Sequence, residues 1–412
     1  MVTMQEIELI HDWNDHNGTQ TKPAQRIEFD DETLRDGLQS PSAFDPLIRE
    51  KLDILHLMVE LGIQAADIAL PAAGQRAIDD ADAILAEIAS AQLPIFPNCA
   101  ARTVISDIEP IVDLSQKHGL AVEVACFIGS SPIRQFAESW DIDFLLKCTE
   151  EAVTFSVKNQ LPVMFVTEDT VRAHPDHVQQ LYETAIRCGA KRLCLTDTVG
   201  HATPNGARQL VQFVREIANR HDPEIQIDWH GHKDRGLSIA NTLSAIEAGA
   251  NRVHGTALGI GERCGNTPME LILVNCKLLG WIEQDLSALA RYVDTVANAT
   301  KTGIPINYPI VGHDAFRTAT GVHASAIIKA QKKGQNWLAD RVYSGVPASW
   351  FGREQMIEIG PMSGVSNVVF WLERNGYAAS EKLVTAIFER AKKHEQTLTR
   401  EEIEQFIHEA EN

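Results

Sequence analysis

The sequence predicts an α/β protein in which a (β/α)8 TIM barrel is followed by a helical C-terminal region. From residue 26 onward, short apolar runs alternate with segments whose apolar residues recur at helical spacing. The alternation repeats about every 30 residues, eight times in all. It occupies residues 26–290, which matches the roughly 250 residues that such a barrel typically needs.

Eight short apolar segments are the predicted strands: 26–30, 65–70, 93–98, 120–128, 162–168, 192–197, 225–230 and 251–257. An open, doubly wound sheet is the competing arrangement for alternating strands and helices. It is disfavoured because no G-x-G-x-x-G follows the first strand, whose turn is anionic instead of glycine-rich. The closed barrel is therefore the expected fold.

Helices are predicted between the strands. In 48–62 the apolar residues share one face, and Gly62 is the expected C-terminal cap. The segment 238–250 ends in the same way at Gly249, and 205–220 is followed by a His-Asp-Pro-Glu turn.

Beyond residue 290 the alternation stops, and further helices are expected at 321–333, 364–375 and 380–394. A last helix begins with Thr399-x-x-Glu402, a capping-box pattern. We therefore expect three parts: an acidic N-terminal extension over 1–25, a catalytic barrel over 26–290, and a helical region over 291–412.

Composition excludes several classes of partner. The formal net charge of −19 argues against nucleic acid and anionic membranes, which select basic surfaces. The seven cysteines are scattered, without C-x-x-C, as in proteins of a reduced compartment. Neither a signal peptide nor an apolar run of about 18 residues is present. A cytoplasmic protein is expected.

In a barrel, active-site residues lie at the carboxyl ends of the strands. The polar residues at those ends are Arg35, Asp36, Glu168, Asp169, Asp197, Thr198, His230, His232 and the loop 259–266. All of these groups are expected to converge on one face of the barrel.

The pair His230-x-His232 is the most informative of these. Side chains at i and i+2 of a strand point the same way, so both imidazoles address one point. This arrangement suits a divalent ion whose remaining ligands are oxygens, and Asp36 and Asn266 are candidates. Such a site leaves positions open for a bidentate substrate. The alternative to a metal site is a pair of surface histidines. If a metal binds, these residues do not distinguish Mg²⁺, Mn²⁺ and Zn²⁺.

Two further features permit either a chemical or a structural interpretation. Glu168 shares a strand face with Val166, and it is either an acid/base group or part of a strand-end salt bridge. The glycines of 259–266 allow unusual backbone angles, so this loop can close over a ligand or form a plain turn. Cys264 in this loop is a candidate nucleophile, although small buried cysteines are usually inert.

The motifs at the strand ends resemble those of a known family. Three carry the likeness: TLRDG at 33–37, HGHKDRGLSIAN at 230–241 and GIGERCGN at 259–266. Together they resemble the TIM-barrel metallolyases of the 2-isopropylmalate synthase and homocitrate synthase group, to which 3-hydroxy-3-methylglutaryl-CoA lyase is related. Further matches are TED at 167–169, DTVG at 197–200, ATP at 202–204, SAIEAGA at 244–250, PIVG-x-x-AF at 309–316 and GVH at 321–323. The resemblance covers about residues 26–370.

The resemblance implies an acyltransferase of amino-acid biosynthesis. Its reaction is a metal-dependent Claisen condensation of acetyl-CoA with a 2-oxo acid, and hydrolysis of the thioester then gives a 2-alkylmalate and CoA. The implied metal ligands are Asp36, His230, His232 and Asn266.

The resemblance also implies roles for other side chains. Arg35 would contact the 2-oxo oxygen, and Thr198 would hold the substrate carboxylate. Glu168 and His323 would form a dyad that deprotonates the acyl-CoA methyl group, with Tyr343 nearby. In this family the C-terminal region reaches the neighbouring barrel, so a homodimer is expected.

Departures from the family bear on the substrate. Leu38 gives RDGLQ, as in 3-hydroxy-3-methylglutaryl-CoA lyase, where the synthases usually have glutamate. Val166 replaces a residue that is often serine. Both changes make the pocket less polar and favour 2-oxoisovalerate. Lyase-type cleavage, a homocitrate or citramalate synthase-type acceptor and a noncatalytic binding protein are the competing hypotheses. Because the chain ends at Asn412, no leucine-regulatory domain is expected.

Overall fold

A computed structural model describes residues 9–18 and 22–411. The chain divides into two compact units, Thr21–Gly303 and Ile304–Asn412, the second together with Met1–Gln20. Of the expected N-terminal extension over 1–25, residues 1–8 and 19–21 lie outside the described residues, and a short 3₁₀ helix, η1, occupies Trp13–Gly18.

The first unit is a closed barrel of eight parallel strands in the order β1 to β8, which confirms the predicted fold class. Pairing of β1 with β8 from Glu28↔Arg252 to Asp31↔Gly255 closes it. The strands are β1 Glu28–Asp31, β2 Ala65–Ala69, β3 Phe96–Arg102, β4 Glu123–Gly129, β5 Val163–Glu168, β6 Arg192–Asp197, β7 Gln226–Gly231 and β8 Arg252–Gly255. Strand β3 runs four residues beyond its predicted end, because small residues after Asn98 continue the strand without an apolar pattern.

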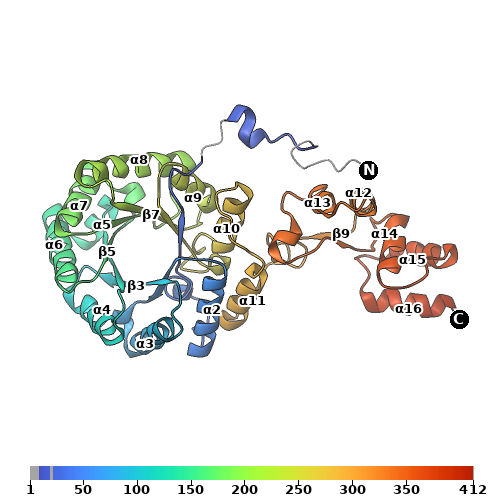
Figure 1. The fold of residues 1–412 in the computed structure, drawn as a ribbon, viewed down its shortest axis with the longest axis horizontal. Helices are drawn as coiled ribbons and strands as arrows, with labels where there is room; N and C mark the ends of the chain where they lie inside the picture. Colours follow the sequence, from blue (N-terminus) through green and yellow to red (C-terminus); the bar gives the residue numbers. More distant parts are fainter. Residues whose placement is uncertain (1–8, 19–21, 412) are drawn as a thin grey trace. The chain divides into compact units, whose positions relative to one another are not determined.

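Helices form an outer ring around the strands (Figure 1). They are α2 Ile48–Glu60, α3 Gln75–Ser90, α4 Ile105–His118, α5 Pro132–Glu138, α6 Ile142–Lys158, α7 Pro175–Cys188, α8 Pro204–His221, α9 Ser238–Glu247, α10 Met269–Leu278 and α11 Leu289–Thr300. Short 3₁₀ helices are η2 Gly37–Gln39, η3 Pro71–Ala73, η4 Thr170–Arg172 and η5 Ala257–Gly259. Helix α11 packs against α2, so this compact unit continues to Gly303. The domain division at residue 290 stays a prediction.

The interior of the barrel carries charge, where layers of branched aliphatic residues are usual. The Arg252 side chain is 1% exposed, and its guanidinium donates to Glu123 at 2.6 Å and to Asp228 at 2.7 Å. Asp228 also accepts from Arg192 at 2.7 Å. Buried charges are tolerated when each is paired and hydrogen-bonded, as these are.

The second unit is mainly helical. Its elements are α12 Gly321–Lys332, α13 Asn336–Arg341, η6 Ala348–Phe351, α14 Val365–Arg374, α15 Glu381–Lys393 and α16 Arg400–Glu411. A small parallel sheet pairs β9 Arg317–Thr318 with β10 Met356–Ile357; strands of two residues have no periodicity from which to predict them. The predicted capping box is confirmed, since Thr399 N donates to Glu402 Oε2 at 2.7 Å and Glu402 N donates to Thr399 Oγ1 at 3.2 Å.

Among the helices in the described part of the chain, none combines the length and the apolar character needed to cross a membrane.

Asp31 in β1 is expected to make the stability of the barrel depend on pH. Burial raises the pKa of its carboxyl group from 3.8 to about 7, although Thr33 and Tyr292 hydrogen-bond to it. The folded protein therefore holds this proton more tightly than the unfolded chain. The resulting stabilisation is complete below about pH 4 and is lost as pH rises through 7, by up to about 4 kcal/mol.

We expect Asp31→Asn to lack this loss, so that its free energy of unfolding gains on the wild type between pH 5 and pH 8. Denaturant titrations at several pH values measure the difference. Asp53→Asn, on the exposed face of α2, is the control and should track the wild type. A constant difference between Asp31→Asn and wild type across this range would refute the assignment.

Candidate active site

Asp36, His230 and His232 form a cluster at the carboxyl end of the barrel. One ligand atom from each lies within 4.8 Å of the others. His230 is in β7 and His232 follows it by two residues, so alternation along the strand brings the ring centroids to 5.2 Å. The Oδ2 atom of Asp36, at the start of η2, lies 4.0 Å from His232 Nε2. The structure thus brings together three of the expected ligands.

Asn266 joins this cluster through the glycine-rich loop. Its Nδ2 donates to Asp36 Oδ2 at 2.7 Å. The loop passes close to itself: a Cβ on Gly265, whose φ is +96°, would lie 1.9 Å from the carbonyl oxygen of Gly259. A Cβ on Gly261 would lie 2.3 Å from Asn266 Nδ2. Only glycine therefore permits the backbone path that presents Asn266 to Asp36.

The donor atoms of the cluster fit a divalent metal. His232 Nδ1 and Asn266 Oδ1 are buried and have no hydrogen-bond partner in the described part of the chain, which is rare for buried polar atoms and indicates a missing partner. Burial, reinforced by the nearby His230, lowers the pKa of His232 to about 4. Its imidazole is therefore neutral at physiological pH, as a metal ligand must be.

Glu32, which the sequence analysis did not select, orients His230. Its Oε2 lies 2.7 Å from His230 Nδ1, which leaves the Nε2 lone pair of His230 for a ligand. A carboxylate behind a histidine is the usual support of a metal-binding imidazole. The signal in the sequence is a third carboxylate in DDETLRD, but the residue that it would contact is 198 positions away.

Glu32 also accepts from His254, whose Nε2 lies 2.9 Å from Asp228. Burial alone would lower the pKa of His254, but the carboxylates of Glu32 and Asp228 raise it to about 10. Both ring nitrogens of His254 are hydrogen-bonded to carboxylates, so neither is left free for a metal. This disfavours the two other groupings with metal-like spacing among the described residues, because both include His254.

Arg35 is held between carboxylates beside the cluster. Its Nε donates to Asp67 at 2.6 Å, and one terminal nitrogen donates to Asp36 at 2.5 Å. Asp67, in β2, was not selected by the sequence analysis. These contacts fix the guanidinium plane before any substrate arrives, which is the preorganisation that oxyanion stabilisation requires.

One cavity of about 140 Å³ contains most of the predicted site residues. Its polar wall includes Arg35, Asp36, Glu168, Thr198, His230 and His232. Its apolar wall includes Ala100, Ala125, Phe127, Met164 and Val166. Burial raises the pKa of Glu168, although the positive charge of Arg134 opposes the shift.

Other predicted residues lie elsewhere. Leu38 lines a neighbouring cavity that shares Arg35 with the first. Cys264 is exposed and is not among the residues lining the Asp36 cavity. In the C-terminal unit, His323 stacks on Tyr343, with ring centroids 4.1 Å apart and planes at 28°.

The fold and the site define a barrel enzyme with a candidate metal centre at the carboxyl ends of its strands. The model of the HMGL-like family matches residues 26–296. The homocitrate synthase AksA of Methanopyrus kandleri is 31% identical over 366 residues, which cover 88% of this chain and 86% of that protein. A probable 2-isopropylmalate synthase of the same organism is 29% identical over 89% of this chain and 69% of that protein.

Among solved structures, the HMG-CoA lyase from Brucella melitensis matches with a TM-score of 0.56 and 17% identity, over 68% of this chain and all of that chain. At this identity the match shows the fold alone. The chain belongs to the HMGL-like family, and it is an enzyme related to named synthases.

Substitution of Glu32 is expected to weaken metal binding without removing a ligand. Glu32→Gln loses the negative charge that fixes the His230 tautomer, so the Kd for Mn²⁺ should rise about 10- to 100-fold. Calorimetric titration of the folded variant with Mn²⁺ measures this Kd. Glu28→Gln is the matched control, because Glu28 begins the strand that leads to Glu32 and accepts instead from Arg192 at 3.2 Å. Equal affinities for the two variants would contradict the role of Glu32.

Proposed function

We propose that this enzyme condenses acetyl-CoA with a 2-oxo acid and then hydrolyses the thioester, giving a 2-alkylmalate and free CoA. The observation that carries the proposal is the convergence of Asp36, His230 and His232 with Arg35 and Glu168 around one cavity. The names of the synthase relatives support the same reaction class.

Asp36, His230, His232 and Asn266 are the residues that would hold a divalent cation, with Mn²⁺, Mg²⁺ and Zn²⁺ as candidates. When bound, the cation would polarise the carbonyl group of the 2-oxo acid. Arg35 would stabilise the alkoxide that develops on that carbonyl oxygen, and Thr198 would bind the substrate carboxylate. Asp67 contributes by holding the Arg35 guanidinium in place at 2.6 Å.

Glu168 is proposed to accept a proton from the methyl group of acetyl-CoA. Its raised pKa brings the carboxylate closer to the working pH, where a general base is most effective. The methyl carbon then bonds to the 2-oxo carbon, and water cleaves the thioester with release of the CoA thiol. His323, supported by Tyr343, is proposed to complete the dyad with Glu168 in the neighbouring barrel of a cytoplasmic homodimer.

The apolar wall of the cavity favours a 2-oxo acid with an apolar side chain, and 2-oxoisovalerate is the proposed acceptor. Met164 and Val166 contribute to this wall from β5. Arg35 is the one arginine or lysine among the described residues that line the cavity. A second carboxylate, as in 2-oxoglutarate, would need a basic partner of its own.

The RDGLQ sequence around Leu38 favours a second candidate, cleavage of a 3-hydroxyacyl-CoA as in 3-hydroxy-3-methylglutaryl-CoA lyase. Condensation with an acceptor of the homocitrate synthase or citramalate synthase type is the third candidate reaction. Leu38 lines the neighbouring cavity, so its direct contact with the acceptor has less support than that of Val166.

An acceptor screen tests the reaction. With acetyl-CoA, Mn²⁺ and a panel of 2-oxo acids, free CoA thiol should be released fastest with 2-oxoisovalerate. Glu168→Gln should lower kcat about 100-fold or more, because it removes the general base. Glu151→Gln, on the exposed face of α6, is the control and should retain full activity. No thiol release with any acceptor, together with cleavage of 3-hydroxy-3-methylglutaryl-CoA, would establish lyase-type cleavage instead.

The acceptor pocket has its own test in Val166→Thr. This change places a hydroxyl group in the apolar wall at almost constant size, so kcat/KM for 2-oxoisovalerate should fall about tenfold. Leu38→Thr should change it by less than about threefold, because Leu38 lines the adjacent cavity. The reverse order of the two effects would assign acceptor selection to Leu38.

A further inference from the structure

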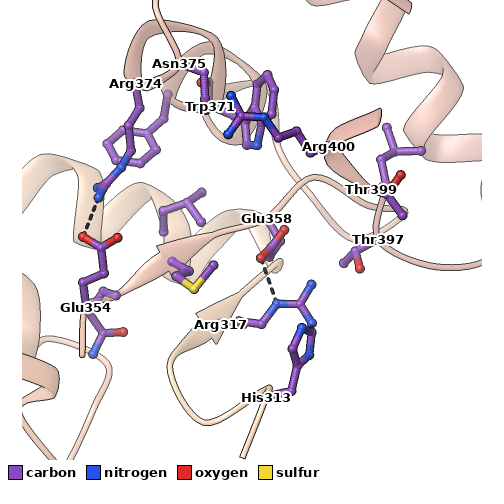
Figure 2. A pocket seen from close by; sticks show the side chains of 15 residues that line it. His313, Arg317, Glu354, Glu358, Trp371, Arg374, Asn375, Thr397, Thr399 and Arg400 are labelled. Carbon is purple, nitrogen blue, oxygen red and sulfur yellow. Dashed lines mark hydrogen bonds and ion pairs between the residues drawn. The ribbon is translucent and has the colours of Figure 1, made fainter. Parts of the chain in front are cut away.

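The C-terminal unit contains a cavity of about 530 Å³ that the proposed condensation does not use. Residues of the β9–β10 sheet, α14 and the chain leading into α16 line it (Figure 2). All of these residues belong to the compact unit that begins at Ile304. The volume falls within the range of about 300–1,000 Å³ that is typical of small-molecule sites.

One wall of this cavity is apolar and aromatic. Trp371 and Phe370 contribute from α14, and Ile357 and Leu398 contribute from β10 and the segment before α16. The Trp371 ring stacks on Tyr377 at an interplanar angle of 9° and a centroid distance of 6.2 Å. Because this stacking fixes the ring, Trp371 offers a rigid flat surface to a ligand.

The charged residues of the cavity wall are held in ion pairs. Arg317 donates to Glu358 at 2.8 Å, and Arg374 donates to Glu354 at 2.5 Å, so both carboxylates are neutralised. The third arginine of the cavity wall, Arg400, is paired as well, but through one nitrogen of its guanidinium group.

Arg400 supplies the third of these guanidinium groups. Its Nε donates to Glu404 at 2.8 Å, and Glu404 is not among the lining residues. In Figure 2 the guanidinium group of Arg400 lies beside the Trp371 ring. The terminal nitrogens of Arg400 have no protein partner among the described residues, so they are available to a ligand.

A buried amide among the lining residues also lacks a partner within the described part of the chain. Gln355 is 7% exposed, and its Nε2 has no hydrogen-bond partner among residues 9–18 and 22–411. Leaving a buried donor unsatisfied costs about 1–3 kcal/mol. This observation is independent of the arginines, and an acceptor atom of a ligand in the cavity that Gln355 lines would satisfy the donor.

We propose that this cavity binds a small organic anion. Arg400 holds its carboxylate or phosphate group through the paired N–H donors of a guanidinium fork. The flat or apolar body of the ligand lies against Trp371 and Leu398. The site is separate from the proposed condensation chemistry and does not depend on it.

Calorimetric titration of the full-length protein tests the proposal. Phenylacetate and adenosine 5′-monophosphate serve as the carboxylate and phosphate probes, in a buffer without other carboxylates or phosphates. The Arg400 and Trp371 variants distinguish binding in this cavity from binding in the barrel. We expect saturable binding of at least one probe at one site per chain. Arg400→Gln should weaken it about tenfold or more, since a charge-assisted hydrogen bond is lost. Trp371→Leu should weaken it about threefold or more, because the flat surface is lost.

Arg390→Gln is the matched control. Arg390 also pairs with a carboxylate, Glu409, and lies over an aromatic ring, Phe406, but it does not line the cavity. The affinity of the Arg390→Gln protein for the probes should equal that of the wild type.

Binding of phenylacetate alone identifies a carboxylate site, and binding of the nucleotide alone identifies a phosphate site. Absence of saturable binding by both probes at millimolar concentrations, or unchanged affinity in Arg400→Gln, would overturn the proposal. The readout is binding, so it stands whether or not the condensation assay succeeds.

Discussion

The carboxylate of Glu32 connects the candidate metal cluster to the charged interior of the barrel. One oxygen lies 2.7 Å from His230, and the other lies 2.9 Å from His254, which in turn meets Asp228. Each charge in this chain of contacts is compensated by the next. Several of these groups have more than one partner: Asp228, for example, also accepts from Arg192 and Arg252. Such sharing is how a dry interior tolerates several charges. The geometry of the cluster therefore depends on Glu32 and His254 as well as on the expected ligands.

This network also explains how a deep polar cavity exists in a barrel. Arg252 and Asp228 fill the centre with paired charge, where aliphatic layers are more common. Above them, small residues such as Ala100 and Ala125 leave room for a ligand. The charged centre and the small residues together place the cavity directly at the histidine pair.

The two cavities that share Arg35 separate two questions about the reaction. The cavity lined by Val166 and Glu168 contains the candidate chemistry, and the cavity lined by Leu38 adjoins it. A difference at Leu38 can therefore change the neighbouring cavity or the position of Arg35 without altering the wall to which Val166 contributes. Because Leu38 and Val166 line different cavities, Leu38 alone does not identify the acceptor.

The sequence by itself determined the elements whose signals are local. Apolar alternation located all eight strands of the barrel, and i, i+2 spacing identified His230 and His232 as a pair facing one point. The capping box at Thr399 was visible for the same reason, since both partners lie within one helical turn.

Only the tertiary structure decided which distant groups complete the site. Glu32 meets His230 across 198 positions of the chain, and Asp67 meets Arg35 across 32. The tertiary structure also placed Leu38 in a cavity adjacent to the one that Val166 lines. Spacing along the chain specifies which way a side chain points within its own element. Closure of the barrel and burial specify which partner it meets there, and those constraints come from the whole fold.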